Sequence, residues 1–260
     1  MLPAAANPSR TEIVSDLRHR LARMEGLPGT AEDGLRFGLP ELDAHLPQGL
    51  AFGAVHEITP AEEADLPAVF GFLMALLARM PGRTPLLLVL SSKKLARYGH
   101  PHGHGLASLG LDPSRLILVE TADEQEALWA TEEAVRSRGP AAVASALGGK
   151  LDLKASQRLL HAARDSKIPL LLLRLGTATV PTATTRWRIA AAPGSRDRFG
   201  LLSGWRWHVT LERCRNGRPG DWMLEVDHAA HRFGLAAAVA GASLARCGAA
   251  GNGSCGAAGN

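Results

Sequence analysis

The chain alternates between short apolar runs and longer segments of mixed polarity from residue 35 to about residue 175. Uninterrupted apolar runs of this kind are typical of parallel strands that crossover helices bury on both faces. The expected strands are residues 54–58, 86–90, 115–120, 141–147 and 168–175. The expected helices cover residues 67–80, 123–138 and 152–166, and their predicted N-caps are Asp65, Asp123 and Asp152.

The pattern changes after residue 180, where strands follow one another without helices between them. Trp, Val and Thr are enriched over residues 184–192, 205–213 and 221–227, and the turn sequence NGRPG separates the last two segments. This pattern predicts an antiparallel hairpin that extends the sheet. From residue 229 the chain is mostly Ala and Gly, so we expect a disordered tail over 229–260.

An amphipathic helix is predicted ahead of the core, over residues 11–25. Its apolar stripe consists of Ile13, Leu17, Leu21 and Met24. A loop rich in Gly and Pro follows it, which places a boundary near residue 30. The predicted organisation is therefore an N-terminal helix and linker over 1–30, a core domain over 31–228 and the tail over 229–260.

Length and composition suit one soluble domain, because 260 residues with 46% hydrophobic content can bury one substantial core. The longest apolar runs are far shorter than the ~20 residues that span a membrane. The first residues lack the basic and apolar regions of a signal peptide, so we expect a cytoplasmic protein. Three cysteines without metal or redox spacing predict no disulfide, and a net charge of +4 is too modest to identify a nucleic-acid binder.

The loop after the first core strand has the position of a phosphate-binding loop but not its chemistry. Such a loop uses glycine N–H groups, a lysine and a hydroxyl to hold phosphates and magnesium. Here the sequence TPAEEADLP supplies prolines, carboxylates and a leucine instead. The residues of this degenerate loop are Pro60, Glu62, Glu63, Asp65, Leu66 and Pro67. The carboxylates repel phosphates, and Asp65 is predicted to cap the following helix with its own side chain.

Three longer stretches carry a resemblance to a known family. Residues 35–58 resemble the segment before the nucleotide loop of the RecA family, residues 97–128 resemble its next helix and strand, and residues 184–190 with 205–226 resemble its late hairpin. Together they resemble more specifically the ImuA family, the RecA-like accessory proteins of bacterial damage-induced mutagenesis. The resemblance implies an α/β fold with a RecA-like, P-loop-NTPase-type core, in which a mostly parallel sheet is flanked by helices and ends in an antiparallel hairpin.

The same resemblance shows where the chain departs from an ATPase. Pro60, Asp65, Leu66 and Pro67 fall where the RecA pattern has Gly, Gly, Lys and Thr. Lys93 lies near the position of the glutamate that activates water, and a protonated lysine is no base. Ser145 and Ala146 end the strand where an acid would help to hold magnesium. We therefore expect no cofactor and no ATP hydrolysis, with a noncanonical ATPase as the alternative.

The resemblance also implies partners and a setting. These are an ImuB-type inactive Y-family polymerase-like protein and an error-prone DnaE-type polymerase, with RecA and DNA as further candidates and no membrane. The implied role is that of a scaffold in translesion DNA synthesis during the SOS response, associated with the nucleoid when active. RecA proteins associate through an N-terminal helix, so the stripe of residues 11–25 is the expected partner-binding surface.

Two groups of polar residues remain as candidate sites. Arginines beside the tryptophans and around the hairpin turn could contact DNA phosphates, or could form a solvated face paired with acids on a neighbouring strand. These arginines are Arg186, Arg188, Arg206, Arg213, Arg215 and Arg218. The second group, His100, His102 and His104, lies in a segment expected to be a flexible surface loop, and we expect no metal site there.

Overall fold

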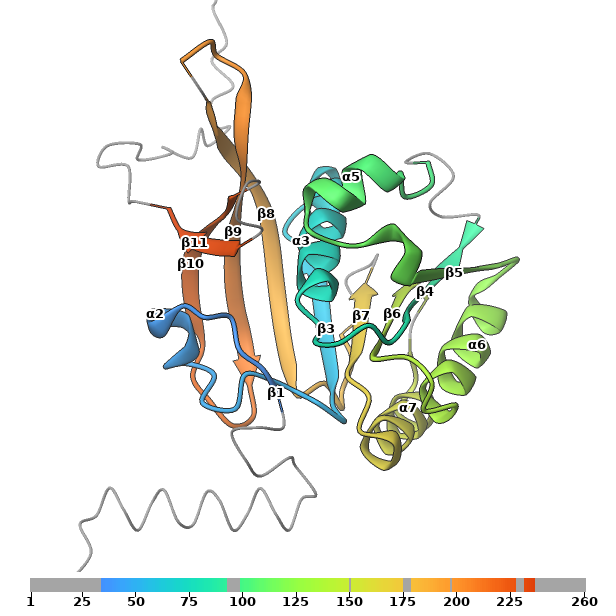
Figure 1. The fold of residues 1–260 in the computed structure, drawn as a ribbon. Helices are drawn as coiled ribbons and strands as arrows, with labels where there is room; N and C mark the ends of the chain where they lie inside the picture. Colours follow the sequence, from blue (N-terminus) through green and yellow to red (C-terminus); the bar gives the residue numbers. More distant parts are fainter. Residues whose placement is uncertain are drawn as a thin grey trace, which may run out of the picture.

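In the described part of the chain, β3 (Val55–Pro60) lies inside a nine-stranded sheet with the order β11-β10-β9-β8-β3-β7-β6-β4-β5 (Figure 1). The structure, a computed structural model, describes residues 34–92, 99–149, 151–174, 179–196, 198–227 and 232–236. The remaining strands of the sheet are β4 (Leu86–Ser91), β5 (Leu116–Thr121), β6 (Ala142–Leu147), β7 (Leu170–Arg174), β8 (Thr185–Arg196), β9 (Leu202–Cys214), β10 (Gly220–Asp227) and β11 (Arg232–Leu235).

The sheet has a parallel half and an antiparallel half that meet at β8. Neighbouring strands from β8 through β3 to β5 are parallel. The strands β8, β9, β10 and β11 are antiparallel to their neighbours. The predicted fold class, a mostly parallel sheet that ends in an antiparallel hairpin, is therefore confirmed. The parallel pairing of β8 with β3 was not predicted, since the sequence analysis placed β8 only in the hairpin region.

Among the residues that the structure describes, helices cover both faces of the parallel half and one face of the antiparallel half (Figure 1). α3 and α5 pack on one face, in a core that also includes Trp187 and Trp207 of the antiparallel strands. α6 and α7 pack on the other face. The helices and short turns are α2 (Pro40–Asp43), η1 (Glu63–Asp65), α3 (Leu66–Ala78), α5 (Gly103–Ser108), η2 (Pro113–Arg115), α6 (Glu124–Arg136) and α7 (Leu153–Ser166). A two-stranded sheet of β1 (Gly34–Leu35) and β2 (Leu50–Ala51) precedes β3. Within the described ranges, every helix is too short or too polar to cross a membrane.

Two of the three predicted helix caps are confirmed. Asp123 accepts a hydrogen bond from the backbone N–H of Glu126 at 2.9 Å, and Asp152 accepts one from Ala155 at 2.6 Å. Each bond satisfies an N–H group that the first turn of a helix leaves without an internal partner. The prediction for Asp65 is wrong, because this side chain makes no cap hydrogen bond to α3.

Residues 232–235 correct the expectation of a disordered tail from residue 229. They form β11, which pairs with β10, and Phe233 is buried in the core. Its ring centroid lies 5.9 Å from that of Phe37, 6.0 Å from that of Phe72 and 6.3 Å from that of Trp207. One aromatic side chain in an Ala- and Gly-rich sequence thus extends the core beyond the expected boundary. The rest of the tail and the predicted N-terminal helix lie outside the described residues.

Candidate functional site

The turn from Pro60 to Pro67 connects the carboxyl end of β3 to the start of α3. In open α/β sheets, ligands bind outside the carboxyl ends of the parallel strands, and an anion there interacts with free backbone N–H groups at a helix start. The turn therefore lies where the sequence predicted a degenerate phosphate loop. It can bind an anion only where its backbone N–H groups have no partner within the protein.

Most N–H groups of this turn already have partners within the protein. Ala61 donates to the carbonyl of Ile189 in β8 at 2.8 Å. Glu62 donates to the Asp65 carboxylate at 3.1 Å, and Asp65 donates to the carbonyl of Glu62 at 3.0 Å. The N–H of Leu66 points to the carbonyl of Glu63. Prolines at both ends of the turn have no N–H, so four of the six N–H groups between them are engaged.

Asp65 closes the turn in a different way from the predicted one. Its carboxylate accepts from Glu62 on one oxygen and from the backbone N–H of Ala191 in β8 on the other, at 2.9 Å. An N-cap normally has extended backbone angles, whereas Asp65 has φ −80° and ψ −4° because η1 runs directly into α3. Pro67 also removes a donor from the first turn of α3. The Asp65 carboxylate thus links the turn to β8 and also bonds within the turn.

The turn presents negative charge to solvent. Glu62 and Glu63 are exposed, and Asp65 is half-buried. Two like charges about 4 Å apart repel by about 1 kcal/mol in a water-like dielectric and by more where solvent is excluded. A triphosphate at this turn would therefore meet carboxylates as well as engaged N–H groups.

The structure describes only some of the other positions at which the sequence departs from an ATPase. Lys93 lies outside the described residues. Ser145 is completely buried, and its hydroxyl accepts a hydrogen bond from Thr131 of α6 at 2.8 Å. His56 and Glu57 point to opposite faces of β3, as predicted from their adjacent positions in a strand. His56 bonds to Thr185 and to the carbonyl of Ala51, whereas Glu57 bonds on the other face.

A buried ionic network around Glu57 was not predicted. The Glu57 carboxylate accepts from Arg186 Nε at 2.7 Å and from the backbone N–H of Val180 at 2.9 Å. Arg174 is also completely buried and donates to the carbonyls of Leu147 and Gly149. Burial lowers the pKa of Arg174, and the carboxylates of Glu57 and Glu124 partly offset this effect. The sequence did contain a signal for this network. Glu57 and Arg174 interrupt apolar strand runs, and a charge that is buried with its strand requires a partner.

Three of the candidate DNA-binding arginines are paired with acids. Arg186 pairs with Glu57, as described. Arg188 pairs with Glu212 at 2.5 Å and Arg206 with Glu225 at 3.0 Å. Arg188 and Arg206 thus form the face paired with acids on a neighbouring strand that the sequence left open as an alternative, whereas the partner of Arg186 is a buried carboxylate. All three pairs leave little net charge from these arginines. Phosphate contacts by them stay a prediction.

The arginines near the β9–β10 turn are placed differently. Arg213 makes a long contact of 3.5 Å to the carbonyl of Pro181, and Arg218 is exposed. The backbone N–H of Arg215 donates to the carbonyl of Thr184. These three residues lie at the far end of the sheet from the Pro60–Pro67 turn, because β8 runs parallel to β3 and begins where β9 ends.

The histidine segment is partly helical, which corrects the expectation of a flexible loop. Gly103–Ser108 form α5, and His102 precedes its first residue. His100 contacts Glu120 at 2.9 Å, and the rings of His102 and His104 lie 5.4 Å apart. Among the described residues, no three His, Cys, Asp or Glu side chains are grouped as a metal site.

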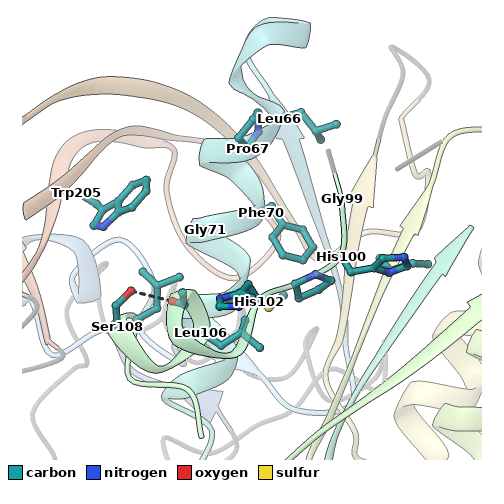
Figure 2. Close-up of a pocket in the computed structure, with 15 residues that line it drawn as sticks. Leu66, Pro67, Phe70, Gly71, Gly99, His100, His102, Leu106, Ser108 and Trp205 are labelled. Atoms are coloured by element: carbon teal, nitrogen blue, oxygen red, sulfur yellow. Dashed lines mark hydrogen bonds between the residues drawn. The ribbon is translucent and has the colours of Figure 1, made fainter. Parts of the chain in front are cut away.

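An apolar groove lies between α3, α5 and β9 (Figure 2). It has a volume of about 320 Å³ and begins at Leu66 and Pro67, directly beside the Pro60–Pro67 turn. Phe70 and Trp205 line it from opposite sides, and His102 lies on its α5 side. The sequence analysis did not predict this groove, because residues far apart in the chain form it.

Comparisons with known proteins agree with this geometry. No family model matches the chain. Protein ImuA of Caulobacter vibrioides strain NA1000 / CB15N is 35% identical over 229 residues, which covers 80% of this chain and 89% of the relative. The same figures hold for Protein ImuA of C. vibrioides strain ATCC 19089 / CIP 103742 / CB 15. The chain belongs to the ImuA family.

The fold of this ImuA-family chain resembles that of a recombinase. The crystal structure of the RadB recombinase matches it with a TM-score of 0.52 and 16% sequence identity, covering 76% of this chain and 98% of that chain. The RecA-like fold predicted from the flanking sequence is therefore confirmed. In this ImuA-family member, a turn connects β3 to α3, and most of its N–H groups and the Asp65 carboxylate bond within the turn or to β8.

Proposed function

We propose that this ImuA-family chain is a non-catalytic accessory protein of damage-induced mutagenesis, which supports translesion DNA synthesis in the SOS response through its surfaces. The observation that carries the proposal is the Pro60–Pro67 turn. Four of its six N–H groups are engaged, its exposed side chains are acidic, and it lacks the lysine and hydroxyl that hold a nucleotide and magnesium. The term pseudo-ATPase describes such a domain.

The proposed partners are those of the family: an ImuB-type inactive Y-family polymerase-like protein, an error-prone DnaE-type polymerase and, as a further candidate, RecA. The proposed contact surface is the apolar stripe of residues 11–25. Its test is a pull-down of these partners with the variant Leu17→Asp/Leu21→Asp. A matched control, Ser15→Asp/Ala22→Asp, places the same charges on the opposite side of the predicted helix. We expect the first variant to lose its partner and the control to retain it, while the core of both variants still unfolds cooperatively.

Equilibrium dialysis with labelled ATP and magnesium tests the non-catalytic role. We expect no binding above that of an unrelated protein, because the turn has no free set of phosphate donors. Micromolar binding that disappears in the variant Glu62→Ala/Glu63→Ala would instead support the noncanonical ATPase, with a nucleotide site at the same turn.

A second candidate function is a DNA-binding module. The exposed side chain of Arg218, together with Arg213 and Arg215 at the same end of the sheet, favours it. Each phosphate contact releases counterions, so the slope of log affinity against log salt measures the number of contacts. If the β9–β10 turn binds DNA, the triple variant Arg213→Ala/Arg215→Ala/Arg218→Ala should flatten this slope by about one unit per lost contact. The variant Arg188→Ala/Arg206→Ala is the control, because both arginines are paired with acids.

A further inference from the structure

The groove between α3, α5 and β9 exposes apolar side chains that the core does not cover. Trp205 is 44% exposed although it lies on the same face of β9 as the buried Trp207. Phe70 of α3 is only half-buried, and it faces the groove (Figure 2). Exposed apolar surface that is hollowed and contiguous marks a binding site more often than scattered apolar residues do.

The chain itself contains a segment with a matching surface. Residues 11–25 have an apolar stripe of Ile13, Leu17, Leu21 and Met24. A helix of about 15 residues is marginal in water unless its apolar face is covered. Apolar residues spaced about one helical turn apart form one face of a helix, and such a face is what a helix lays into an apolar groove. The stripe and the groove therefore match in chemistry.

The chain enters the described structure on the correct side of the sheet. Arg79, directly after α3, donates to the carbonyls of Phe37 at 2.8 Å and Arg36 at 3.1 Å. Phe37 belongs to the same core cluster as α3. The residues that follow the N-terminal segment thus lie at the C-terminal end of the helix whose other end borders the groove.

The connecting segment is long enough for this chain to reach its own groove. Arg79 lies thirteen positions after Leu66, which corresponds to about 20 Å of helix at 1.5 Å per residue. Residues 26–33 number eight and can span up to about 26 Å when extended. The linker is therefore long enough to bring residues 11–25 alongside α3.

The charges at one end of the groove suit the same segment. Glu62 and Glu63 are exposed just before Leu66 and Pro67, which line that end. Residues 18–23 of the segment carry Arg18, Arg20 and Arg23 beside the apolar stripe. Opposite charges at the rim orient a segment whose apolar residues provide the affinity.

We propose that the groove between α3, α5 and β9 is the docking site for residues 11–25 of the same chain. The apolar stripe then rests against α3, α5 and Trp205 until a partner withdraws it. This inference stands apart from the proposed function, because it concerns the isolated chain and needs no partner for its test.

Hydrogen exchange of the full chain tests the contact. In the variant Leu17→Asp/Leu21→Asp, we expect backbone amides of residues 66–74 and 103–109 to exchange about fivefold faster than in the unaltered chain, because local protection follows local cover. Amides of α6, on the other face of the sheet, should not change. The control Ser15→Asp/Ala22→Asp should match the unaltered chain. Equal exchange in the stripe variant and the control overturns the proposal.

A second variant links the effect to the groove. In a Trp205→Thr background, the stripe substitutions should have a smaller effect on the exchange of residues 66–74, because coupled residues show non-additive effects. An undiminished effect contradicts docking against Trp205. Exchange is then repeated at widely separated protein concentrations. Protection that is independent of concentration supports docking within one chain, whereas protection that appears only at high concentration assigns the groove to a second copy and overturns the proposal.

Discussion

Arg186 donates a hydrogen bond to Glu57 at 2.7 Å, although the two residues are 129 positions apart in the chain. The Glu57 side chain is completely buried, and that of Arg186 is 19% exposed. This pair connects β8 to β3 on the face that α6 and α7 cover. Arg188, two residues further along β8, makes a similar pair with Glu212 near solvent, with 49% of its side chain exposed. The two arginines thus offer a matched comparison of a buried and an exposed ion pair.

Replacing Arg186 with Ala should therefore destabilise the domain by about 3–5 kcal/mol, since it leaves a buried carboxylate with less compensation. Arg188→Ala, on the same strand, should cost less than about 1 kcal/mol, because solvent screens the exposed pair. Urea denaturation of both variants measures these losses. Equal losses would show that the burial of Glu57 does not control the energy of its pair.

Asp65→Ala should lower the free energy of unfolding by about 1–2 kcal/mol, because it removes the acceptor for the N–H groups of Glu62 and Ala191. Asp65→Asn keeps one carbonyl oxygen and should lose about half as much. The measurement is again the urea midpoint at constant slope. No loss in Asp65→Ala would mean that water replaces both hydrogen bonds and that the turn is not fastened by this side chain.

His56 should make stability depend on pH in a defined window. Complete burial lowers the pKa of His56 from 6.5 to about 4, with the bond to the Ala51 carbonyl partly offsetting the effect. The unfolded chain therefore takes up a proton at higher pH than the folded chain does. Stability from neutral His56 is fully present above pH 6.5 and decreases by about 3 kcal/mol as the pH falls to 4.

The variant His56→Gln isolates this contribution, because glutamine can also bond to Thr185 and Ala51 but does not titrate. Unfolding free energies of both chains are measured between pH 7.5 and pH 4.5, and their difference removes the common contribution of the carboxylates. Parallel pH profiles for the two chains would contradict a buried, neutral histidine.

Phe233→Ala should destabilise the domain by about 3 kcal/mol, the usual cost of removing a buried phenylalanine ring. Leu235, in the same strand, is only half-buried, so Leu235→Ala should cost clearly less. Thermal unfolding of the two variants gives the comparison. If Phe233→Ala has no effect, β11 contributes nothing to the core and the expected boundary near residue 228 holds.

Much of the fold could be predicted because the sequence signals are local. Apolar runs marked the strands of the parallel half, and Asp123 and Asp152 marked two helix starts. Asp65 has the same residue type and the same relation to a helix, yet it bonds elsewhere. The difference arises from the 3-10 turn that precedes α3 and from the nearby N–H of Ala191, which is distant in sequence. A cap rule based on residue type cannot include either factor.

The acids that pair with the surface arginines could not be identified from the sequence either, because they too are distant in the chain. The acids that neutralise Arg188 and Arg206 lie on other strands, 24 and 19 residues away. Which strands are neighbours depends on the register of the sheet, and a shift of one residue would turn the same side chains to the other face. Phe233 was missed because one buried residue gives no periodic signal in an Ala- and Gly-rich sequence.

β8 joins the two halves of the sheet and also holds the turn after β3, through the carbonyl of Ile189 and the N–H of Ala191. A turn bound in this way has little freedom to open and close around a ligand. Under the proposed function, no nucleotide hydrolysis in this domain would limit the lifetime of a complex, and dissociation rates alone would set how long each complex lasts.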